Sequence, residues 1–567
     1  MNKGIAGSAG YGVGKVVIIS DAKPEYENRT ITDTDAEIKR YDDAVAAFTE
    51  KTHAMAEAMK ESVGEHNAEI LEGHILLLTD PGMDEITKGA IMSGTCAEAA
   101  FESTCDMFAG MFQMADDELT RQRATDIGDI KVRMLKILTG TPDVNISEVP
   151  AGTILVAEDL TPSMTAGIVK ENVAGIITAV GGKTSHSAIL ARALEIPAVL
   201  SVDGIVDMVS DGMTAVVDGC DGICILDPSQ EEIDEYQAKR EKYLSDKAFL
   251  EVYRGKDTVT ADGVKVHLYG NIGNPEDAKQ VAAYDGEGVG LFRTEFLFMG
   301  ASELPSEEEQ FQAYKAAAET MEGREVIIRT LDVGGDKDIP YLGLEKEDNP
   351  FLGFRAVRYC LQNKDSYRVQ LRALLRASAF GDIKIMVPLV TCVDEIRSVK
   401  ALVKELMAEL DAENIAYNKD IQVGAMIETP AASLIADLLA KEADFFSIGT
   451  NDLTQYTMAV DRGNAKVAYL YSSYNPAVLR SMKNIIEAAN VAGIMAGMCG
   501  EAAADPLLIP LLISFGLGEF SVSATSVLAT RGTIAKWSKA EADELAAKAL
   551  SLATETEVAE LLRANTR

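Results

Sequence analysis

A histidine on a glycine-rich turn is the first candidate for chemistry in this chain. His186 lies in the segment GGKTSHS (residues 181–187), between a strand-like run and the apolar pattern of a helix. Paired glycines favour a tight turn, and a helix N-terminus attracts anions. Because neutral imidazole is a good nucleophile near pH 7, we predict that His186 accepts a phosphoryl group. The alternative is an ordinary surface or structural histidine, and it stays open until a phosphoryl donor is found.

A second set of polar residues follows strand-like runs in the second half of the chain. Arginine binds phosphate and carboxylate groups through paired hydrogen bonds, and carboxylate oxygens suit Mg²⁺. A thiol can pass a proton to a substrate carbon. Residues of these types, with one amide, stand at or just beyond the ends of such runs: Arg293, Arg329, Glu428, Asn451, Asp452 and Cys499. Their shared position predicts a site for a small phosphorylated carboxylate. A purely stabilising role would not explain why all six residues follow strand-like runs.

These residues need a fold that brings strand ends to one face. From residue 257 onward, strand-like and helix-like runs alternate in the pattern of a (β/α)8 barrel, whose C-terminal strand ends converge on one site. The expected strands are residues 264–270, 288–293, 326–329, 383–388, 423–427, 445–448 and 494–498. The segment 353–355 is expected to supply the eighth.

The first half is predicted to combine an α/β domain with a helical insertion. Strand-like runs fall in residues 1–20 and 145–227, whereas residues from about 30 to 144 follow a helical pattern. The helical segment 70–78 is more apolar than one buried stripe requires, so it is either a buried bundle helix or an exposed docking surface. The charged residues 229–254 predict a solvated linker helix.

Composition limits the partners and the location. The chain has 567 residues, enough for three or four domains, and its 89 acidic and 53 basic residues give a formal net charge of −36. Such a chain repels nucleic acid and attracts a partner with a basic surface. Its apolar runs are interrupted and its N-terminus lacks signal-peptide features, so we expect a cytoplasmic protein without membrane insertion. The seven scattered cysteines argue against a disulfide framework and against a zinc site.

Several long motifs resemble those of enzyme I of the bacterial phosphotransferase system, the phosphoenolpyruvate–protein phosphotransferase family. GGKTSHSAILARALEIPAV resembles the family's phosphohistidine signature, with His186 as the acceptor. The segment 159–165 resembles the one whose threonine, here Thr165, contacts that histidine. GLFRTEFLF, IIRTLDVGGDK, FLGFRAVR, MIETPAA, SIGTNDLTQYTMAVDR and MCGEAA resemble barrel motifs of the family, and the resemblance covers essentially the whole chain.

The resemblance implies a role for each matching residue. It implies that phosphoenolpyruvate is bound by Arg293, Arg329, Arg355, Asn451, Asp452 and Arg462. It further implies Mg²⁺ at Glu428 and Asp452, and a proton donor at Cys499. The helical insertion then corresponds to the docking domain for the small carrier protein HPr, with His74 and Arg123 in matching segments, and the family is usually a homodimer through the barrel.

The expected architecture is therefore a multidomain α/β protein. A swivelling phosphohistidine α/β domain is expected in residues 1–20 and 145–227, with a helical carrier-docking domain inserted at 21–144. A linker helix is expected at 228–256, and the phosphoenolpyruvate-binding and dimerising (β/α)8 barrel at 257–567.

Two other functions fit part of this pattern. A phosphoenolpyruvate synthase or dikinase shares the histidine domain and the barrel, but it needs an ATP-binding domain for which this chain has no room and no P-loop. A non-catalytic phosphoenolpyruvate sensor would not need the reactive residues to be intact. Three positions depart from the family's pattern, at Ser201, Gly518 and Val522, where glycine, aspartate and methionine are common. None of the three is a proposed catalytic residue.

Overall fold

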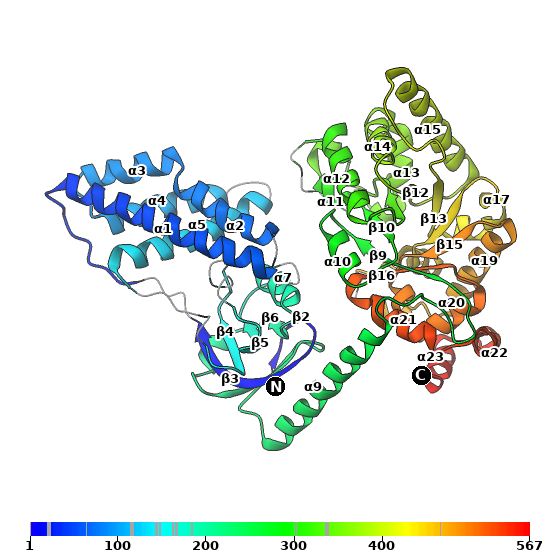
Figure 1. Cartoon of the computed structure of the whole chain (residues 1–567), viewed down its shortest axis with the longest axis horizontal. Helices are drawn as coiled ribbons and strands as arrows, with labels where there is room; N and C mark the ends of the chain where they lie inside the picture. Colours follow the sequence, from blue (N-terminus) through cyan, green and yellow to red (C-terminus); the bar gives the residue numbers. More distant parts are fainter. Residues whose placement is uncertain are drawn as a thin grey trace. The chain divides into compact units, whose positions relative to one another are not determined.

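In the computed structural model the chain divides into two units, Met1–Ala248 and Phe249–Arg567. The boundary falls within helix α9 (Gln230–Leu250), at the place of the predicted solvated helix (Figure 1). The structure describes residues 2–19, 24–63, 65–113, 118–141, 146, 149–161, 164, 168–182, 185–299, 301, 303–334, 339–464 and 466–567.

The second unit is built on a closed barrel of eight parallel strands, which confirms the predicted fold class. Each strand pairs with the next in the chain, and the last closes the barrel by pairing with the first (Figure 1). The strands are β9 (His267–Ile272), β10 (Val289–Arg293), β11 (Val326–Arg329), β12 (Ile383–Val387), β13 (Val423–Ile427), β14 (Phe445–Ile448), β15 (Met495–Met498) and β16 (Glu519–Ser523). The helices are α10 (Asp277–Ala283), α11 (Glu295–Met299), α12 (Glu307–Thr320), α13 (Ala356–Gln362), α14 (Lys364–Ala377), α15 (Val393–Glu413), α16 (Pro430–Leu434), α17 (Ala436–Leu439), α18 (Thr450–Met458), α19 (Pro476–Ala492), α20 (Ile509–Phe515), α21 (Val527–Ala535), α22 (Lys539–Ser551) and α23 (Glu555–Ala564).

The eighth strand is β16, so the prediction that residues 353–355 form a strand is wrong. Those residues connect a short 3-10 turn to α13. β16 was not predicted because polar residues interrupt its apolar run. Glu519 and Ser521 alternate along the strand and point into the barrel, whereas Phe520 and Val522 join the core between barrel and helices. A strand whose inward face is polar does not show the continuous apolar pattern expected of a buried parallel strand.

The helical part of the first unit packs around one apolar core that includes Tyr41, Phe48, Phe101 and Met134. Its helices are α1 (Thr34–Val63), α2 (Glu65–Leu78), α3 (Pro81–Met92), α4 (Ala97–Gln113) and α5 (Glu118–Thr139). The apolar segment 70–78 belongs to α2, which buries Leu71 and Leu78 and leaves Leu76 74% exposed. The buried-helix alternative therefore describes most of this segment.

The remainder of the first unit is a mixed sheet in the strand order β1-β8-β7-β3-β4-β5-β6-β2. The strands are β1 (Asn2–Lys3), β2 (Ile5–Ser8), β3 (Tyr11–Ile19), β4 (Thr153–Ala157), β5 (Val173–Thr178), β6 (Ala198–Leu200), β7 (Thr214–Asp218) and β8 (Ile223–Leu226), and the helices are α7 (His186–Ala193) and α8 (Ile205–Met208). The N-terminal strand β3 pairs with β4 across the helical insertion. No helix in the described parts of the chain combines the length and apolarity that a membrane crossing requires.

Candidate functional site

A cavity of about 610 Å³ lies at the C-terminal ends of the barrel strands. All eight residues that the sequence predicted for this site line it: Arg293, Arg329, Arg355, Glu428, Asn451, Asp452, Arg462 and Cys499. Arg293 and Arg329 end β10 and β11, and Glu428 and Cys499 directly follow β13 and β15. Asn451 and Asp452 lie at the start of α18, Arg462 lies beyond that helix, and Arg355 directly precedes α13. Segments far apart in the sequence therefore present cationic, anionic and thiol groups to one volume.

Two buried arginines of the cavity, Arg329 and Arg355, share a carboxylate. Asp332 accepts a hydrogen bond from Arg355 Nη2 at 2.7 Å and lies 3.1 Å from Arg329 Nη1. Arg329 Nη2 also donates to Glu295 Oε1 at 2.5 Å. Burial lowers the pKa of Arg329, but Glu295 and Asp332 outweigh it and hold that pKa above its usual value. Both guanidinium groups therefore stay charged, while the Nε atom of each meets no hydrogen-bond partner in the described structure.

Asp452 connects Arg355 to a further arginine of the cavity. Its Oδ1 lies 3.0 Å from Arg462 Nη1, and its Oδ2 lies 3.6 Å from Arg355 Nη2. Asn451 Oδ1 accepts a long hydrogen bond, 3.4 Å, from the Glu501 N–H. Four arginines and five acidic groups thus line one cavity, and this preformed charge network can exchange internal partners for the oxygens of an anion.

Arg293 and Arg462 are both exposed, but Arg462 is paired with Asp452 and Arg293 is not paired with a carboxylate of the described residues. The guanidinium carbon of Arg293 lies 5.5 Å from the centre of the Phe296 ring. No carboxylate in the described ranges lies within 4.0 Å of its guanidinium nitrogens. Its charge is therefore available to a ligand without breaking an internal bond.

Glu428 is the carboxylate best suited to a metal ion. It is 2% exposed, its Oε1 accepts a hydrogen bond from the Leu389 N–H at 2.7 Å, and a Cβ at Gly449 would lie only 2.4 Å from its Oε2. Leu389 presents that N–H from a left-handed conformation, with φ of 55°. Burial, followed by the charges of Asp452 and Asp332, raises the pKa of Glu428 to about 8. A carboxylate whose charge is so poorly compensated would gain from a cation.

The carboxylates of Glu428 and Asp452 suit Mg²⁺ better than they suit a metal ion whose ligands all come from the protein. Within the described residues, no three His, Cys, Asp or Glu side chains gather as a ligand set. Mg²⁺ typically takes one or two carboxylates and completes its shell with water and substrate phosphate oxygens. The donor set present here therefore fits Mg²⁺ bound together with a phosphorylated ligand.

Cys499 follows β15, lines the cavity and is 8% exposed. Burial raises the pKa of its thiol to about 12, against smaller opposing effects of Ser447 and Arg329. The thiol is therefore protonated near neutral pH and can give up a proton as an acid.

The histidine loop leads into helix α7, whose first residue is His186. Ser185 caps the helix by accepting a hydrogen bond from the Ala188 N–H, and Gly181 adopts a φ of 110° that favours glycine. Ser201, one of the departures from the family's pattern, has a φ of 54°, and its hydroxyl donates to the Gly181 carbonyl at 2.6 Å. The serine thus occupies a backbone conformation suited to glycine and ties it to the start of the loop. The His186 side chain and Thr165 lie outside the described residues.

Comparison with known proteins gives the same architecture. Three family models match: "PEP-utilising enzyme, N-terminal" at residues 3–123, "PEP-utilising enzyme, mobile domain" at 149–222 and "PEP-utilising enzyme, PEP-binding domain" at 247–539. A Bacillus subtilis protein named phosphoenolpyruvate-protein phosphotransferase is 47% identical over 98% of both chains. The chain belongs to this family. Relatives of the same name from Geobacillus stearothermophilus, 47% identical over 99% of this chain and 97% of the relative, and from Staphylococcus carnosus, 45% identical over 100% and 99%, agree.

The two residues that the family resemblance assigns to carrier docking lie in different surroundings. His74 is 1% exposed on α2, with its ring nitrogens 3.5 Å from Asp126 and 3.7 Å from Asp129. Arg123 on α5 is exposed. A buried ring can act on a docking partner only by holding α2 and α5 together, whereas Arg123 can contact one directly, and both docking roles stay predictions.

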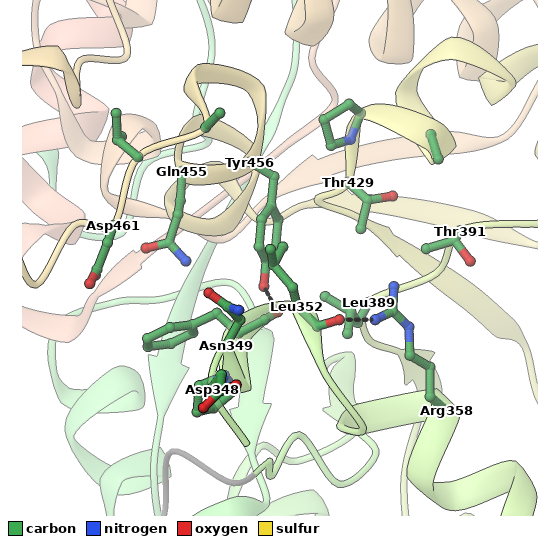
Figure 2. A pocket seen from close by; sticks show the side chains of 16 residues that line it. Asp348, Asn349, Leu352, Arg358, Leu389, Thr391, Thr429, Gln455, Tyr456 and Asp461 are labelled. Carbon is green, nitrogen blue, oxygen red and sulfur yellow. Dashed lines mark hydrogen bonds between the residues drawn. The ribbon is translucent and has the colours of Figure 1, made fainter. Parts of the chain in front are cut away.

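A second cavity, of about 660 Å³, adjoins the first across the segment 348–352. Figure 2 shows Tyr456 at the centre of its lining, and the Tyr456 hydroxyl donates to the Phe351 carbonyl at 2.5 Å. The same hydroxyl accepts a hydrogen bond from Arg355 Nη1 at 3.3 Å. Tyr456 therefore connects this segment to the arginine network of the first cavity.

Three supporting residues of the site were not predicted from the sequence. Glu295 and Asp332 lie two and three residues beyond Arg293 and Arg329, inside motifs already noted, and Tyr456 lies one turn after Asp452. A search for acidic partners within one turn of each strand-end arginine would have found the first two.

The other two departures from the family's pattern, Gly518 and Val522, are also explained in part. Val522 lines the cavity, and a Cβ at Gly518 would lie 2.3 Å from Met495 Sδ.

Proposed function

We propose that this enzyme transfers the phosphoryl group of phosphoenolpyruvate to its own His186 and then to a histidine of the carrier protein HPr. This is the first step of sugar uptake by the phosphotransferase system. The observation that carries the proposal is the convergence of four arginines, two carboxylates, an amide and a thiol on one cavity at the barrel's C-terminal end. Phosphoenolpyruvate combines a phosphate, a carboxylate and a carbon that must be protonated, and this set meets each need.

The residues act in a definite order. Arg293, Arg329 and Arg355 bind the anionic oxygens and hold the phosphoryl group in line for attack. His186 attacks phosphorus through a ring nitrogen, the bond between phosphorus and the enol oxygen breaks, and the enolate of pyruvate remains. The Cys499 thiol then donates its proton to the enolate carbon, giving pyruvate.

Mg²⁺ belongs to the same proposal. Glu428 and Asp452 would hold it, and when bound it neutralises phosphate charge and supports the leaving oxygen. Because Glu428 must be deprotonated to act as a ligand, binding of the ion also displaces the proton that burial favours.

The remaining assignments follow from the family. The α/β part, residues 1–20 and 145–227, carries His186, and the insertion, residues 21–144, receives HPr through a surface that includes Arg123. Residues 228–256 link them to residues 257–567, which hold the substrate site and form a homodimer in the cytoplasm. Sedimentation of the full chain, with and without phosphoenolpyruvate and Mg²⁺, tests the dimer.

Labelled phosphoenolpyruvate tests the main reaction. We expect an acid-labile phosphoryl label on the protein that requires Mg²⁺, disappears in His186→Ala and passes to added HPr. His53→Ala is the matched control, because His53 is an exposed histidine of α1 that the proposal does not use. Label that persists in His186→Ala, or that comes from ATP instead, would refute the proposal, and the second result would favour a synthase or dikinase.

A further inference from the structure

A carboxyl group that the proposed reaction does not use lies inside the barrel. Glu519, on β16, is 2% exposed. Its carboxyl fills space left by two glycines, since a Cβ at Gly290 would lie 2.4 Å from its Oε1 and a Cβ at Gly497 would lie 1.7 Å from its Oε2. Any larger residue at either position would displace it. The barrel therefore contains a built place for one carboxyl group.

The Glu519 carboxyl lies inside the barrel on the N-terminal side of Cys499. Gly497 is paired with Glu519 on one side and with Ser447 on the other. Because side chains along a strand alternate, Cys499, two residues beyond Gly497, shares its inward face. Neighbouring strands lie about 5 Å apart, so Ser447 and Glu519 flank Gly497 from the strands on either side, with no side chain of Gly497 between the hydroxyl and the carboxyl. The effect of Ser447 on the thiol pKa reflects the proximity of its hydroxyl to Cys499.

Two polar atoms in this part of the barrel have no partner. Ser447 Oγ and Glu519 Oε1 are both buried, and neither meets a hydrogen-bond partner among the described residues. A buried polar atom without a partner loses the hydrogen bonds that it makes with water in the unfolded chain, so such groups call for an explanation. Both atoms lie between the thiol and the opposite end of the barrel.

A water-sized space lies next to Glu519, toward the N-terminal ends of the barrel strands. A cavity of about 10 Å³ is lined by Glu519, Tyr269, Glu325 and Lys384, among others. A space of about this size holds one water molecule when polar groups surround it. Lys384 Nζ pairs with Glu325 Oε2 at 2.5 Å, and these side chains are 16% and 18% exposed, so this group of polar residues reaches solvent.

The charge state of Glu519 suits a proton carrier. Burial first, and the charge of Glu325 second, raise its pKa well above the usual range, against the opposing effect of Lys384. Glu519 therefore carries a proton at neutral pH, close to a thiol that loses one in each reaction.

We propose that Glu519 resupplies Cys499 with a proton drawn from the N-terminal end of the barrel, away from the substrate cavity. The inference rests on the proposed role of Cys499 as proton donor. When the thiol protonates the enolate carbon, an S–H bond breaks, a C–H bond forms and a thiolate remains. The Ser447 hydroxyl passes its proton to the thiolate and receives one from the Glu519 carboxyl. Glu519 then takes a proton from the cavity water, which regains one from solvent beside Lys384.

The test separates carbon chemistry from proton exchange. The full chain is incubated in D₂O with Mg²⁺, phosphoenolpyruvate and carbon-labelled pyruvate. Transfer of the carbon label into phosphoenolpyruvate measures the reversible reaction, and loss of the pyruvate methyl signal in proton NMR measures deuterium uptake. When Cys499 cannot exchange its proton with solvent, it returns the same hydrogen. The ratio of deuterium uptake to carbon interchange therefore reports on the relay.

In Glu519→Gln, which keeps the shape and removes the transferable proton, we expect this ratio to fall about tenfold while carbon interchange continues. Ser447→Ala should do the same and decides the question if Glu519→Gln does not fold. Ser378→Ala, a buried serine at the end of α14, is the matched control and should keep the parent ratio.

An unchanged ratio in the relay variants would overturn the proposal, because the proton would then come through the substrate cavity. A proportional fall of both rates would also overturn it, since that is the result of a purely structural role. If the parent enzyme shows no carbon interchange at all, the proposed function fails and the relay falls with it. If Glu519→Gln and Ser447→Ala both show carbon interchange with normal deuterium uptake, the relay is refuted and the proposed function stands.

Discussion

Replacing Asp332 with asparagine should destabilise the barrel by about 3 kcal/mol, the lower end of the range for a broken buried ion pair. Asp332 is 4% exposed and serves two guanidinium groups, Arg355 at 2.7 Å and Arg329 at 3.1 Å. Asparagine has nearly the same shape, but it keeps only one acceptor oxygen and turns an NH₂ group toward the other arginine. One charge-assisted hydrogen bond, each worth about 1.5–3 kcal/mol, is lost and a buried cation loses its counter-charge.

The only tryptophan of the chain makes this measurement specific. Trp537 is 4% exposed within the barrel unit, so its fluorescence during urea unfolding reports on that unit. Asp348→Asn, an exposed aspartate in the same connection between β11 and α13, is the control and should change the free energy of unfolding by less than about 0.5 kcal/mol. If Asp332→Asn unfolds at the same urea concentration as Asp348→Asn, the buried-charge reasoning is wrong.

Three further predictions concern separate features. Below its pKa of about 8 Glu428 is protonated, so Mg²⁺ affinity measured by calorimetry should rise with pH up to about 8 and level off above it, and Glu428→Gln should abolish this dependence. Gly290→Ala should destabilise the barrel by about 1–3 kcal/mol, because its Cβ would meet the Glu519 carboxyl, and shortening that side chain in Glu519→Ala should recover part of the loss in the double variant. Ser201→Gly should change stability by less than about 1 kcal/mol, because relief of the left-handed conformation offsets the lost hydrogen bond, but it should speed amide hydrogen exchange near Gly181; unchanged exchange would show that the bond does not hold the loop.

The sequence was most informative where chemistry and strand position coincide. Arg293, Arg329, Glu428 and Cys499 could be predicted because each reactive type follows a recognisable apolar strand, and parallel strands bring their ends together. Arg355 was found only through a family motif, since it precedes α13 and follows no strand. The structure places all of them at one cavity, while their roles remain proposals.

What the sequence did not reveal depends on contacts between distant segments. Nothing in the local pattern around Asp332 indicates that it faces Arg355, because that contact depends on the path of the connection between β11 and α13. β16 was overlooked for a related reason, since the cavity left by Gly290 and Gly497 is what allows Glu519 to stand inside a barrel. The apolar pattern of a sequence is thus a poor guide to strands whose neighbours in the barrel contribute glycines, because the space left there can hold a polar side chain.

The backbone of Leu389 has a consequence for how this enzyme can evolve. Leu389 is 1% exposed and holds a left-handed φ of 55°, a conformation that costs a non-glycine residue about 1–2 kcal/mol, and it directs its N–H to Glu428. Selection for heat resistance alone therefore favours glycine or asparagine at this position. Such replacements widen the range of directions that the N–H can take, so a gain in heat resistance there comes with a less firmly held Glu428, the proposed metal ligand. Lineages that need both properties must find their stability elsewhere in the barrel.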